Sequence, residues 1–199
     1  MNEAQLVAQA REGDFAAFEA LVNASEGKVY GHLLRLLGNP DDARDLLQET
    51  YLSAYRHLQS FKGDSAFTTW VYRIATNHAL MRLRKKQPES VGLDEITVPS
   101  HEELKGRNIS DWAINPREAV LRKEVRRVLD EAIQSLPPSY RAVVVLRDIQ
   151  DMDTRETAEI LRISEGAVKT RLHRARIFLR EILGPYFEGD VPGGGTAAA

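Results

Sequence analysis

Apolar residues recur along most of this chain at the three- and four-residue spacing that places them on one face of an α-helix. The pattern returns after each break in the first 86 residues, and the breaks are Gly13, the pair Asn39 and Pro40, and the segment 61–65. These breaks contain residues that favour turns and helix ends. No segment shows the sustained alternation of a β-strand. The pattern therefore predicts an all-α protein.

The helical pattern lapses between the two halves of the chain. Residues 89–116 hold six acidic and two basic side chains with interspersed Pro and Gly, and this stretch is too long for an ordinary loop in one compact domain. We predict two small helical domains, residues 1–88 and 117–184, joined by a flexible linker at 89–116. Residues 185–199 are predicted to be a disordered tail. The sequence leaves open whether Trp112 docks on a domain or contacts a partner.

The charge is close to balanced overall but is unevenly distributed. The chain has 27 Lys and Arg against 29 Asp and Glu, a formal net charge of -2. The stretch 61–86 nevertheless carries six basic residues and one acidic residue, and so does the stretch 162–180. Two basic stretches on an acidic background predict two contacts with a polyanion.

Several classes of protein are disfavoured by composition. The chain has no cysteine, which excludes disulfides and thiolate sites and agrees with a reducing compartment. No signal peptide or apolar run long enough for a membrane span is visible, so we expect a cytoplasmic protein without membrane insertion. The acidic group around Asp41, Asp42, Asp45 and Glu49 could resemble a metal cluster. Acidic residues at a helix start also interact well with the helix dipole, and we therefore predict no metal, no cofactor and no enzymatic activity.

The second basic stretch fits a helix-turn-helix within residues 153–183. Asp153 and Glu156 have the spacing of a capping box, and Ser164 could cap a longer second helix. One face of that helix is apolar and comprises Val168, Leu172, Ala175, Leu179 and Ile182. A short helix, a tight turn and a longer basic helix are typical of DNA binding in the major groove. A solvated basic face on an ordinary helical hairpin is the other interpretation.

The first basic stretch is predicted to form a helix from about residue 67 to 86, with Asp64 or Ser65 as its cap. It also contains aromatic residues. Rings beside cations suit single-stranded bases, which offer faces for stacking and can be held in pockets. The alternative is that these rings are core, which the spacing of Trp70 and Ile74 on one stripe favours for Trp70. For Phe61, beside a glycine turn, the two interpretations are evenly balanced.

Four segments together are similar to a known family. Residues 61–79, FKGDSAFTTWVYRIATNHA, resemble the promoter-melting segment of the extracytoplasmic-function (ECF) group of bacterial sigma factors. Residues 41–58, DDARDLLQETYLSAYRHL, resemble their polymerase-binding helix. Residues 135–149 and 157–176 resemble their upstream-promoter-reading domain. The match runs in the family's order along most of the chain.

The resemblance implies roles for particular residues. Contacts with the melted non-template strand near the -10 element are implied for Phe61, Lys62, Gly63, Asp64, Ser65, Phe67, Arg73, Thr76, Asn77, Arg82 and Arg84. Binding of core RNA polymerase is implied for Asp45, Leu47, Gln48, Glu49 and Tyr55. Contacts with the -35 duplex are implied for Ser164, Glu165, Lys169, Thr170, Arg171, Arg174 and Arg176. Lys169, Thr170 and Arg171 are placed for base edges, whereas Arg174 and Arg176 suit phosphates.

The resemblance also implies partners. They are the largest and second-largest subunits of core RNA polymerase, promoter DNA in duplex and single-stranded form, and an anti-sigma factor. The chain would then direct polymerase to -35/-10 promoters and help to melt the -10 region. A stand-alone helix-turn-helix regulator, which would bind duplex DNA without polymerase, is the alternative.

Overall fold

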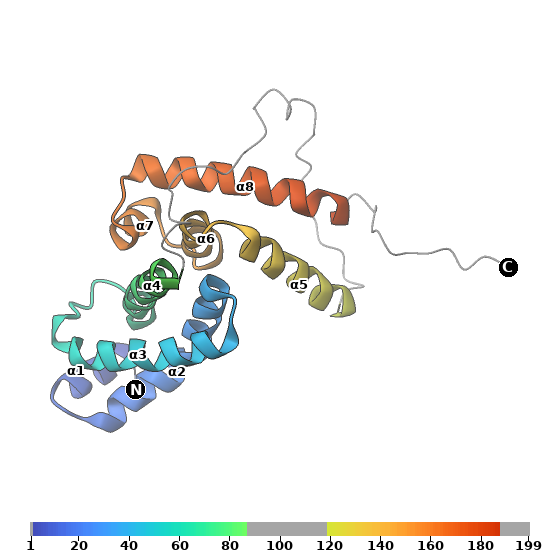
Figure 1. Cartoon of the computed structure of the whole chain (residues 1–199). Coiled ribbons are helices and arrows are strands. Elements are labelled where there is room, and N and C mark those ends of the chain that lie inside the picture. The colour runs from blue at the N-terminus through green and yellow to red at the C-terminus, as the bar shows by residue number, and fades with distance from the viewer. Residues whose placement is uncertain (1, 87–118, 188–199) are drawn as a thin grey trace.

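The computed structural model describes residues 2–86 and 119–187, and within these two ranges the regular structure is entirely helical (Figure 1). The first range contains α1 (Glu3–Arg11), α2 (Phe15–Leu37), α3 (Pro40–Arg56), the 3-10 turn η1 (Leu58–Ser60) and α4 (Phe67–Lys86). The second contains α5 (Ala119–Ser135), α6 (Pro138–Val144), the short π-helix η2 (Val145–Ile149), α7 (Thr154–Leu161) and α8 (Glu165–Phe187). The all-α fold with two small helical domains is confirmed. The predicted linker, Trp112 and most of the predicted tail lie outside the described residues.

The breaks identified in the sequence are helix boundaries. Asp14 accepts hydrogen bonds from the backbone N–H groups of the first turn of α2, which leaves fewer of these donors unpaired. α2 ends at Gly38, whose φ of 74° is readily adopted by glycine. Asn39 then caps α3 through its side chain, with Pro40 at the first helical position. Asp41 and Asp42 therefore lie in the first turn of α3, next to the cap.

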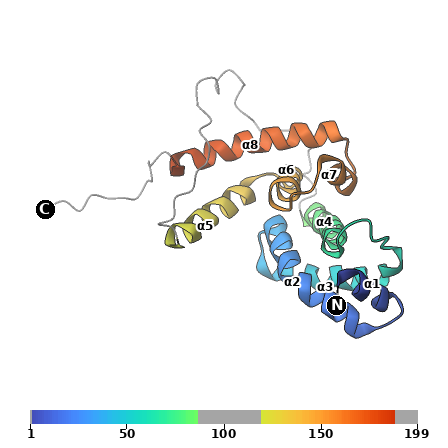
Figure 2. The ribbon, with the colours of Figure 1, turned by 180° about the vertical axis from the view of Figure 1, so that it is seen from behind.

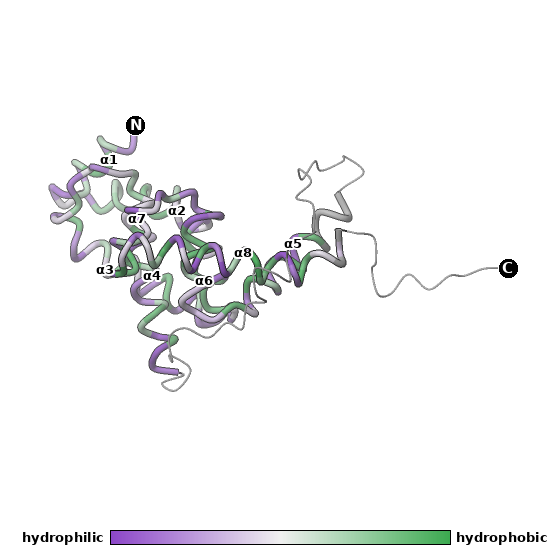
Figure 3. The backbone as a smooth tube through the Cα atoms, turned by 90° about the horizontal axis from the view of Figure 1, so that it is seen from above, coloured by the Kyte–Doolittle hydropathy of each residue, from purple (hydrophilic) through white to green (hydrophobic). Residues whose placement is uncertain are grey.

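The core of the first domain lies around α2, which packs against α1, α3 and α4. Val29 and Leu33 of α2, Ala43 of α3, and Val71 and Ala75 of α4 have no exposed surface. These positions repeat at helical spacing on each element, so each helix turns one apolar face to the others. Figure 3 shows hydrophobic and hydrophilic residues alternating along the helices in the same way.

The second domain is built around α6 and the following η2. Ala142, Val143 and Val145 are fully buried, as are Val168 and Ala175 of α8. Figures 1 and 2 show α8 lying across α5, α6 and α7 on the side away from the first domain. The apolar face predicted for the second helix of the helix-turn-helix is thus the face that α8 turns toward its own domain.

The two domains pack directly against each other. The C-terminal part of α2 contacts α5 and α6, and α4 contacts α6 and α7. Both views of the ribbon show α5, α6 and α7 between α8 and the first domain (Figures 1 and 2). The loop before α4 and the helix-turn-helix are therefore parts of one joined body in this structure.

Candidate nucleic-acid interface

A pocket of about 450 Å³ opens at the loop between η1 and α4. It is lined by Ser60, Phe61, Lys62, Asp64, Ser65, Trp70 and Arg73. Five of these residues belong to the set predicted to hold -10 DNA, whereas Ser60 and Trp70 do not. Gly63 bends the loop with a φ of 83°, a conformation that L side chains rarely adopt. The structure therefore brings much of the predicted loop set together around one open cavity, with the cations Lys62 and Arg73 in its lining.

The loop is held in place by α1, through contacts that the sequence did not predict. Arg11 donates hydrogen bonds to the backbone carbonyls of Leu58, Gln59 and Phe61. The side chain of Gln59 donates in return to the carbonyl of Arg11 at 2.7 Å. These contacts join residues about 50 positions apart, so local patterning carries no signal for them. They fix the entry to the loop on a rigid helix.

The other end of the loop is also supported from α1. The backbone N–H of Phe67, at the start of α4, donates to Oε1 of Glu3 at 2.9 Å. The sequence suggested Asp64 or Ser65 as the cap of this helix, but the carboxylate that contacts its first turn comes from α1. An anionic side chain is well placed at the positive end of a helix. Asp64 is left exposed at the pocket.

The aromatic residues of the loop form a cluster beneath it. Phe61 and Phe67 are 4% and 1% exposed, and their ring centroids lie 6.1 Å apart at a steep angle. Trp70 packs on both, at 5.1 Å from Phe61 and 5.9 Å from Phe67, and is half-buried. The core interpretation thus holds for Phe67 and largely for Phe61. A buried ring cannot stack on a base, so Phe67 supports the loop from the interior, while an edge of Phe61 reaches the pocket.

Thr76 is also an interior residue. It has no exposed surface, and its Oγ1 lies 2.8 Å from Nε2 of His32 on α2. The imidazole of His32 packs on the ring of Tyr72 at 4.8 Å. A fully buried threonine cannot reach DNA, so Thr76 is removed from the set of direct contacts. It holds α4 against α2 one residue before Asn77, which is partly exposed.

We expect His32 to make the stability of the first domain depend on pH. Burial, assisted by the charge of Arg35, lowers the pKa of His32 from 6.5 to about 3. Between pH 6.5 and about 3, His32 is therefore protonated in the unfolded chain but neutral in the folded chain. The free energy of unfolding falls as the pH drops through this range. Between pH 7.5 and 5.5 the loss from this residue is about 1.4 kcal/mol. Urea unfolding of His32→Gln should show a pH dependence smaller by that amount; an unchanged dependence would contradict the assignment.

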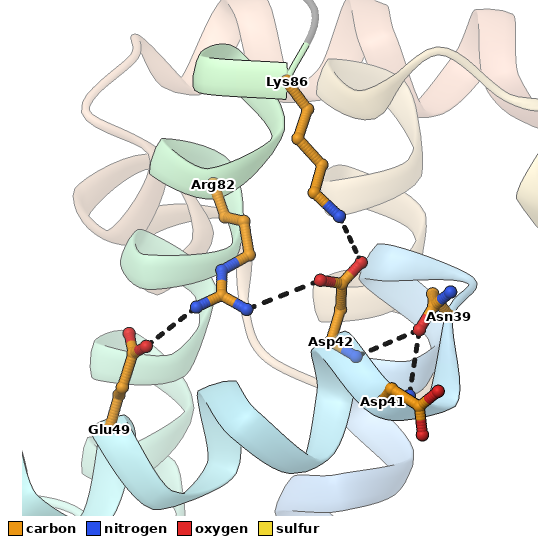
Figure 4. A network of polar contacts seen from close by, with 6 residues as sticks. All are labelled: Asn39, Asp41, Asp42, Glu49, Arg82 and Lys86. Carbon is orange, nitrogen blue, oxygen red and sulfur yellow. Dashed lines mark hydrogen bonds and ion pairs between the residues drawn. The ribbon is translucent and has the colours of Figure 1, made fainter.

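Arg82 and Lys86, at the end of α4, are held by carboxylates of α3 (Figure 4). Arg82 lies 2.8 Å from Oε1 of Glu49 and 3.5 Å from Oδ1 of Asp42. Lys86 contacts the other oxygen of Asp42, and the hydrogen bond from Lys86 holds the pKa of Asp42 below its usual value. Arg84 is exposed. The DNA contact predicted for Arg82 would require it to exchange these carboxylates for DNA.

A mixed polar and apolar surface covers the outer face of α3. Asp45, Gln48, Glu49 and Tyr55 are exposed there, and Leu47 is half-buried. Leu52 is 58% exposed and lies between Gln48 and Tyr55 on the same helical face. Phe15 is 64% exposed and its ring lies 6.1 Å from that of Tyr55. Exposed apolar residues gathered in this way mark a surface for another protein. Leu52 and Phe15 extend the predicted polymerase-binding set.

The helix-turn-helix in the second domain has the predicted local structure. Asp153 and Glu156 form the capping box at the start of α7. Arg162 closes α7 in the left-handed conformation, with a φ of 55°. The side chain of Ser164 accepts a hydrogen bond from the N–H of Ala167 at 3.1 Å, which caps α8. The turn therefore presents the first turns of α8 at an exposed end of the domain.

The basic residues of α8 lie on its outer side. Lys169, Thr170 and Arg174 are exposed, and Arg171 is half-buried beside them. Arg176 differs, because it forms two hydrogen bonds to Asp148 of η2, at 3.0 and 2.6 Å. These bonds raise the pKa of Arg176. Glu165 is exposed in the first turn of α8, where it could accept a hydrogen bond from a cytosine amino group. The polar and charged side chains of residues 164–174 are thus accessible to a partner, whereas Val168 and Leu172 of the same segment are buried.

The described residues show no group of three or more His, Cys, Asp or Glu side chains arranged to hold a metal ion. Among the same residues, no helix combines the length and the hydrophobicity that crossing a bilayer requires. Three acidic residues of α3 form ion pairs: Asp41 with Arg44, Asp42 with Arg82 and Lys86, and Glu49 with Arg82.

A pocketed loop on one helical domain and a helix-turn-helix on the other are thus the two candidate nucleic-acid surfaces of this chain. The family model for Sigma-70 region 2 matches residues 21–89, and that for Sigma-70, region 4 matches residues 126–179. The chain is 37% identical over 177 residues to the ECF RNA polymerase sigma factor SigW of Bacillus subtilis, covering 89% of this chain and 94% of the relative. It is 33% identical over 187 residues to the RNA polymerase sigma-H factor of Pseudomonas aeruginosa, covering 92% and 95%.

A solved structure has the same fold. The structure of CnrH in complex with the cytosolic domain of CnrY aligns with a TM-score of 0.60 at 28% identity, covering 92% of this chain and 97% of that one. Together with the identity to the relatives over most of both chains, these matches establish the family. This chain belongs to the ECF sigma factors of RNA polymerase.

Proposed function

We propose that the chain is a bacterial transcription initiation factor that binds core RNA polymerase and directs it to promoters with -35 and -10 elements. The observation that carries this proposal is the pairing of a pocketed, cation-lined loop with a separate helix-turn-helix in one chain of this family. Run-off transcription with core polymerase, with and without the chain, on a library of promoters tests it. Transcripts that start only when the chain is present support the proposal, and their absence from every promoter rejects it.

The proposed domains follow the two matched regions. Residues 1–88 bind polymerase and the -10 element, residues 117–184 read the -35 element, and residues 89–116 connect them. Polymerase binds through the outer face of α3, at Asp45, Leu47, Gln48, Glu49 and Tyr55, with Leu52 and Phe15 added from the structure. An anti-sigma factor is a further proposed partner, and the solved neighbour CnrH is itself bound to a second protein.

The loop before α4 captures the melted strand. Lys62, Asp64, Ser65 and Arg73 line the pocket together with an edge of Phe61, and Gly63 gives the loop its shape. Asn77 lies one helical turn beyond Arg73 on α4, while Arg82 and Arg84 lie further along it. Peptide and amide groups can bond the edge of an extruded base, and the cations can hold its phosphates. The pocket thus offers a site for one unpaired base.

The free energy of binding unpaired bases explains how a protein that hydrolyses no nucleotide could melt DNA. Opening a base-pair step costs about 1.4 kcal/mol on average. Stacking of an unpaired base on an aromatic side chain returns about 1–3 kcal/mol, and only the opened strand can stack in this way. Preferential binding of the open state therefore shifts the equilibrium toward melting. Because an unpaired base is recognised in the same step, melting and sequence choice are coupled.

The upstream element is read by the exposed side of α8. Lys169, Thr170 and Arg171 are proposed to contact base edges, and Arg174 to contact phosphate. Ser164 and Glu165 lie at the N-terminal end of the same surface. Arg176 joins the phosphate contacts only if it leaves Asp148. A stand-alone regulator would use this surface alone, so tight binding of duplex DNA in a gel shift without polymerase would favour that alternative.

Asn77→Ala is expected to weaken promoter opening more than polymerase binding. Asn77 is partly exposed on α4 and is not part of the buried contact between Thr76 and His32. Removing one base contact of this kind costs about 1–3 kcal/mol, or roughly 5- to 150-fold in the open-complex equilibrium. Permanganate footprinting of the bubble measures this loss. Thr76→Ser, which keeps the buried hydroxyl, serves as the control, and an unchanged bubble in Asn77→Ala would remove this residue from the site.

A further inference from the structure

The loop that carries the pocket forms few hydrogen bonds of its own. No backbone N–H or carbonyl group of residues 62–65 is paired with any residue that the structure describes. The hydroxyl of Ser65 reaches only the carbonyl of Ala66, at 3.4 Å. A segment with so few bonds is ordered mainly by what holds its two ends, because little within it opposes local opening.

Both ends of this loop are held by α1. At one end, Arg11 donates to three carbonyls within residues 58–61. At the other end, Glu3 accepts a hydrogen bond from the N–H of Phe67 at 2.9 Å. These two loop anchors, Glu3 and Arg11, are eight positions apart on one helix, which corresponds to a rise of about 12 Å. The length of α1 therefore sets the separation between the ends of the loop.

The loop anchors lie on a helix that is itself well fixed. A capping box closes the N-terminal end of α1, and Val7 and Ala10 are buried where α1 packs against α2. On a helical wheel, positions 3, 7, 10 and 11 fall within about 100° of one another. Glu3 and Arg11 thus lie along the face that α1 turns toward its own domain, and the packing of that face holds them beside the loop.

Arg11 also fixes the orientation of the first peptide of the loop, because it holds the carbonyl of Phe61. The described peptide bonds are all trans, and in a trans peptide the carbonyl and the following N–H point in opposite directions. The N–H of Lys62 is therefore directed away from Arg11, and it has no acceptor among the described residues. Lys62 lines the pocket. Arg11 thus keeps one unpaired backbone donor available there.

We propose that Glu3 and Arg11 are positioning residues for -10 recognition, which hold the pocket in its binding geometry before DNA arrives and make no contact with DNA. The proposal rests on the proposed function, in which the loop before α4 captures an unpaired base. An anchored loop loses its conformational freedom on folding, whereas an unanchored loop loses it when the base binds. Removal of an anchor should therefore weaken base capture and lower discrimination, without changing the outer face of α3.

The first measurement uses the free chain and needs neither polymerase nor DNA. Ala66 is exposed at the end of the loop and the chain has no cysteine, so Ala66→Cys carries a single nitroxide label whose line shape reports nanosecond motion of the loop. Arg11→Met removes the guanidinium and should increase the mobile component of the spectrum at the expense of the immobile one. Arg11→Lys keeps a point charge and should give an intermediate spectrum. Glu12→Ala, at an exposed residue next to Arg11, is the control and should leave the spectrum unchanged.

The second measurement uses holoenzyme assembled with core polymerase. Permanganate footprinting gives the fraction of open complex on a promoter selected by run-off transcription and on versions with one -10 base changed. Arg11→Met and Glu3→Ala should lower the open-complex equilibrium on the selected promoter about tenfold and less on the changed ones, so that discrimination falls. Glu3→Gln keeps an oxygen acceptor for the N–H of Phe67 and should restore most of the loss. The affinity for core polymerase without DNA should stay that of the wild type, which general damage to the domain would not allow.

The two measurements together separate this proposal from the proposed function. If the anchor variants leave discrimination intact, or lower it without loosening the loop, Glu3 and Arg11 are not positioning residues for -10 recognition. The same conclusion follows if the affinity for polymerase falls in parallel with discrimination. If wild-type holoenzyme opens no promoter, the proposed function fails and the -10 role fails with it, whereas the line shapes still show whether α1 orders the loop.

Discussion

Replacing Leu52 with aspartate is expected to lower the affinity for core RNA polymerase by at least about thirtyfold. The side chain is 58% exposed on the outer face of α3 and belongs to an apolar patch with Tyr55 and Phe15. Buried apolar anchors near the centre of an interface contribute about 2 kcal/mol or more, which corresponds to that factor. A carboxylate at this position would have to be desolvated without a partner. Fluorescence anisotropy of the labelled chain with core polymerase, without DNA, measures the change.

A second exposed apolar residue provides the control for Leu52. Met81 is 66% exposed on α4, and Met81→Asp introduces the same charge away from the outer face of α3. It should leave the affinity for polymerase unchanged, and both variants should keep the melting temperature of the wild type within a few degrees because both residues are exposed. Equal loss in the two variants would indicate a general effect of charge and would move the polymerase surface away from Leu52.

Local features of the fold were predictable because they depend on neighbours in the sequence. The spacing of apolar residues predicted the helix from 67 to 86, and the structure has α4 at Phe67–Lys86. Asp153, Glu156 and Ser164 form the predicted caps around the turn of the helix-turn-helix. A cap needs only three or four consecutive residues, so its partners can be read from the sequence directly.

The contacts between distant segments were not predictable in this way. Periodicity shows that a helix has an apolar face, but it does not show which element covers that face. Glu3 therefore took the place expected for Asp64 or Ser65 at the start of α4. Arg11 and Gln134 had no sequence signal either, because each bonds to backbone carbonyls, which every residue offers. The packing of the two domains follows from such contacts.

The basic residues of the candidate site also show which features the sequence predicts and which it does not. Contacts with DNA were predicted for Arg82 and Arg176, whereas each has a carboxylate partner within the chain, Glu49 and Asp148 respectively. Arg84, Lys169 and Arg174 are exposed. Solvent-accessible ion pairs are worth only about 0–1 kcal/mol, so DNA can compete with these carboxylates for Arg82 and Arg176 at a small cost.

Replacing Arg171 with alanine is expected to reduce the dependence of transcription on the -35 sequence. Arg171 lies in the second turn of α8, next to Lys169 and Thr170, whose side chains are exposed. An arginine that bonds a guanine edge discriminates by about 1–3 kcal/mol, which is roughly 5- to 150-fold. Its loss should therefore flatten the ranking of promoters that differ at one -35 base pair while leaving their -10 ranking intact. Competitive run-off transcription on such a set measures both rankings together.

Arg174→Ala is the informative comparison for Arg171. It lies one turn further along α8 and is proposed to contact phosphate, which carries no sequence information. Its loss should weaken binding to all promoters alike and lower the salt dependence by about one unit in the slope, with the ranking preserved. If Arg174→Ala changes the ranking and Arg171→Ala only weakens binding, then α8 enters the groove in a different register. If neither variant changes any ranking, neither arginine reads a base, because truncating a base-reading arginine cannot leave discrimination intact.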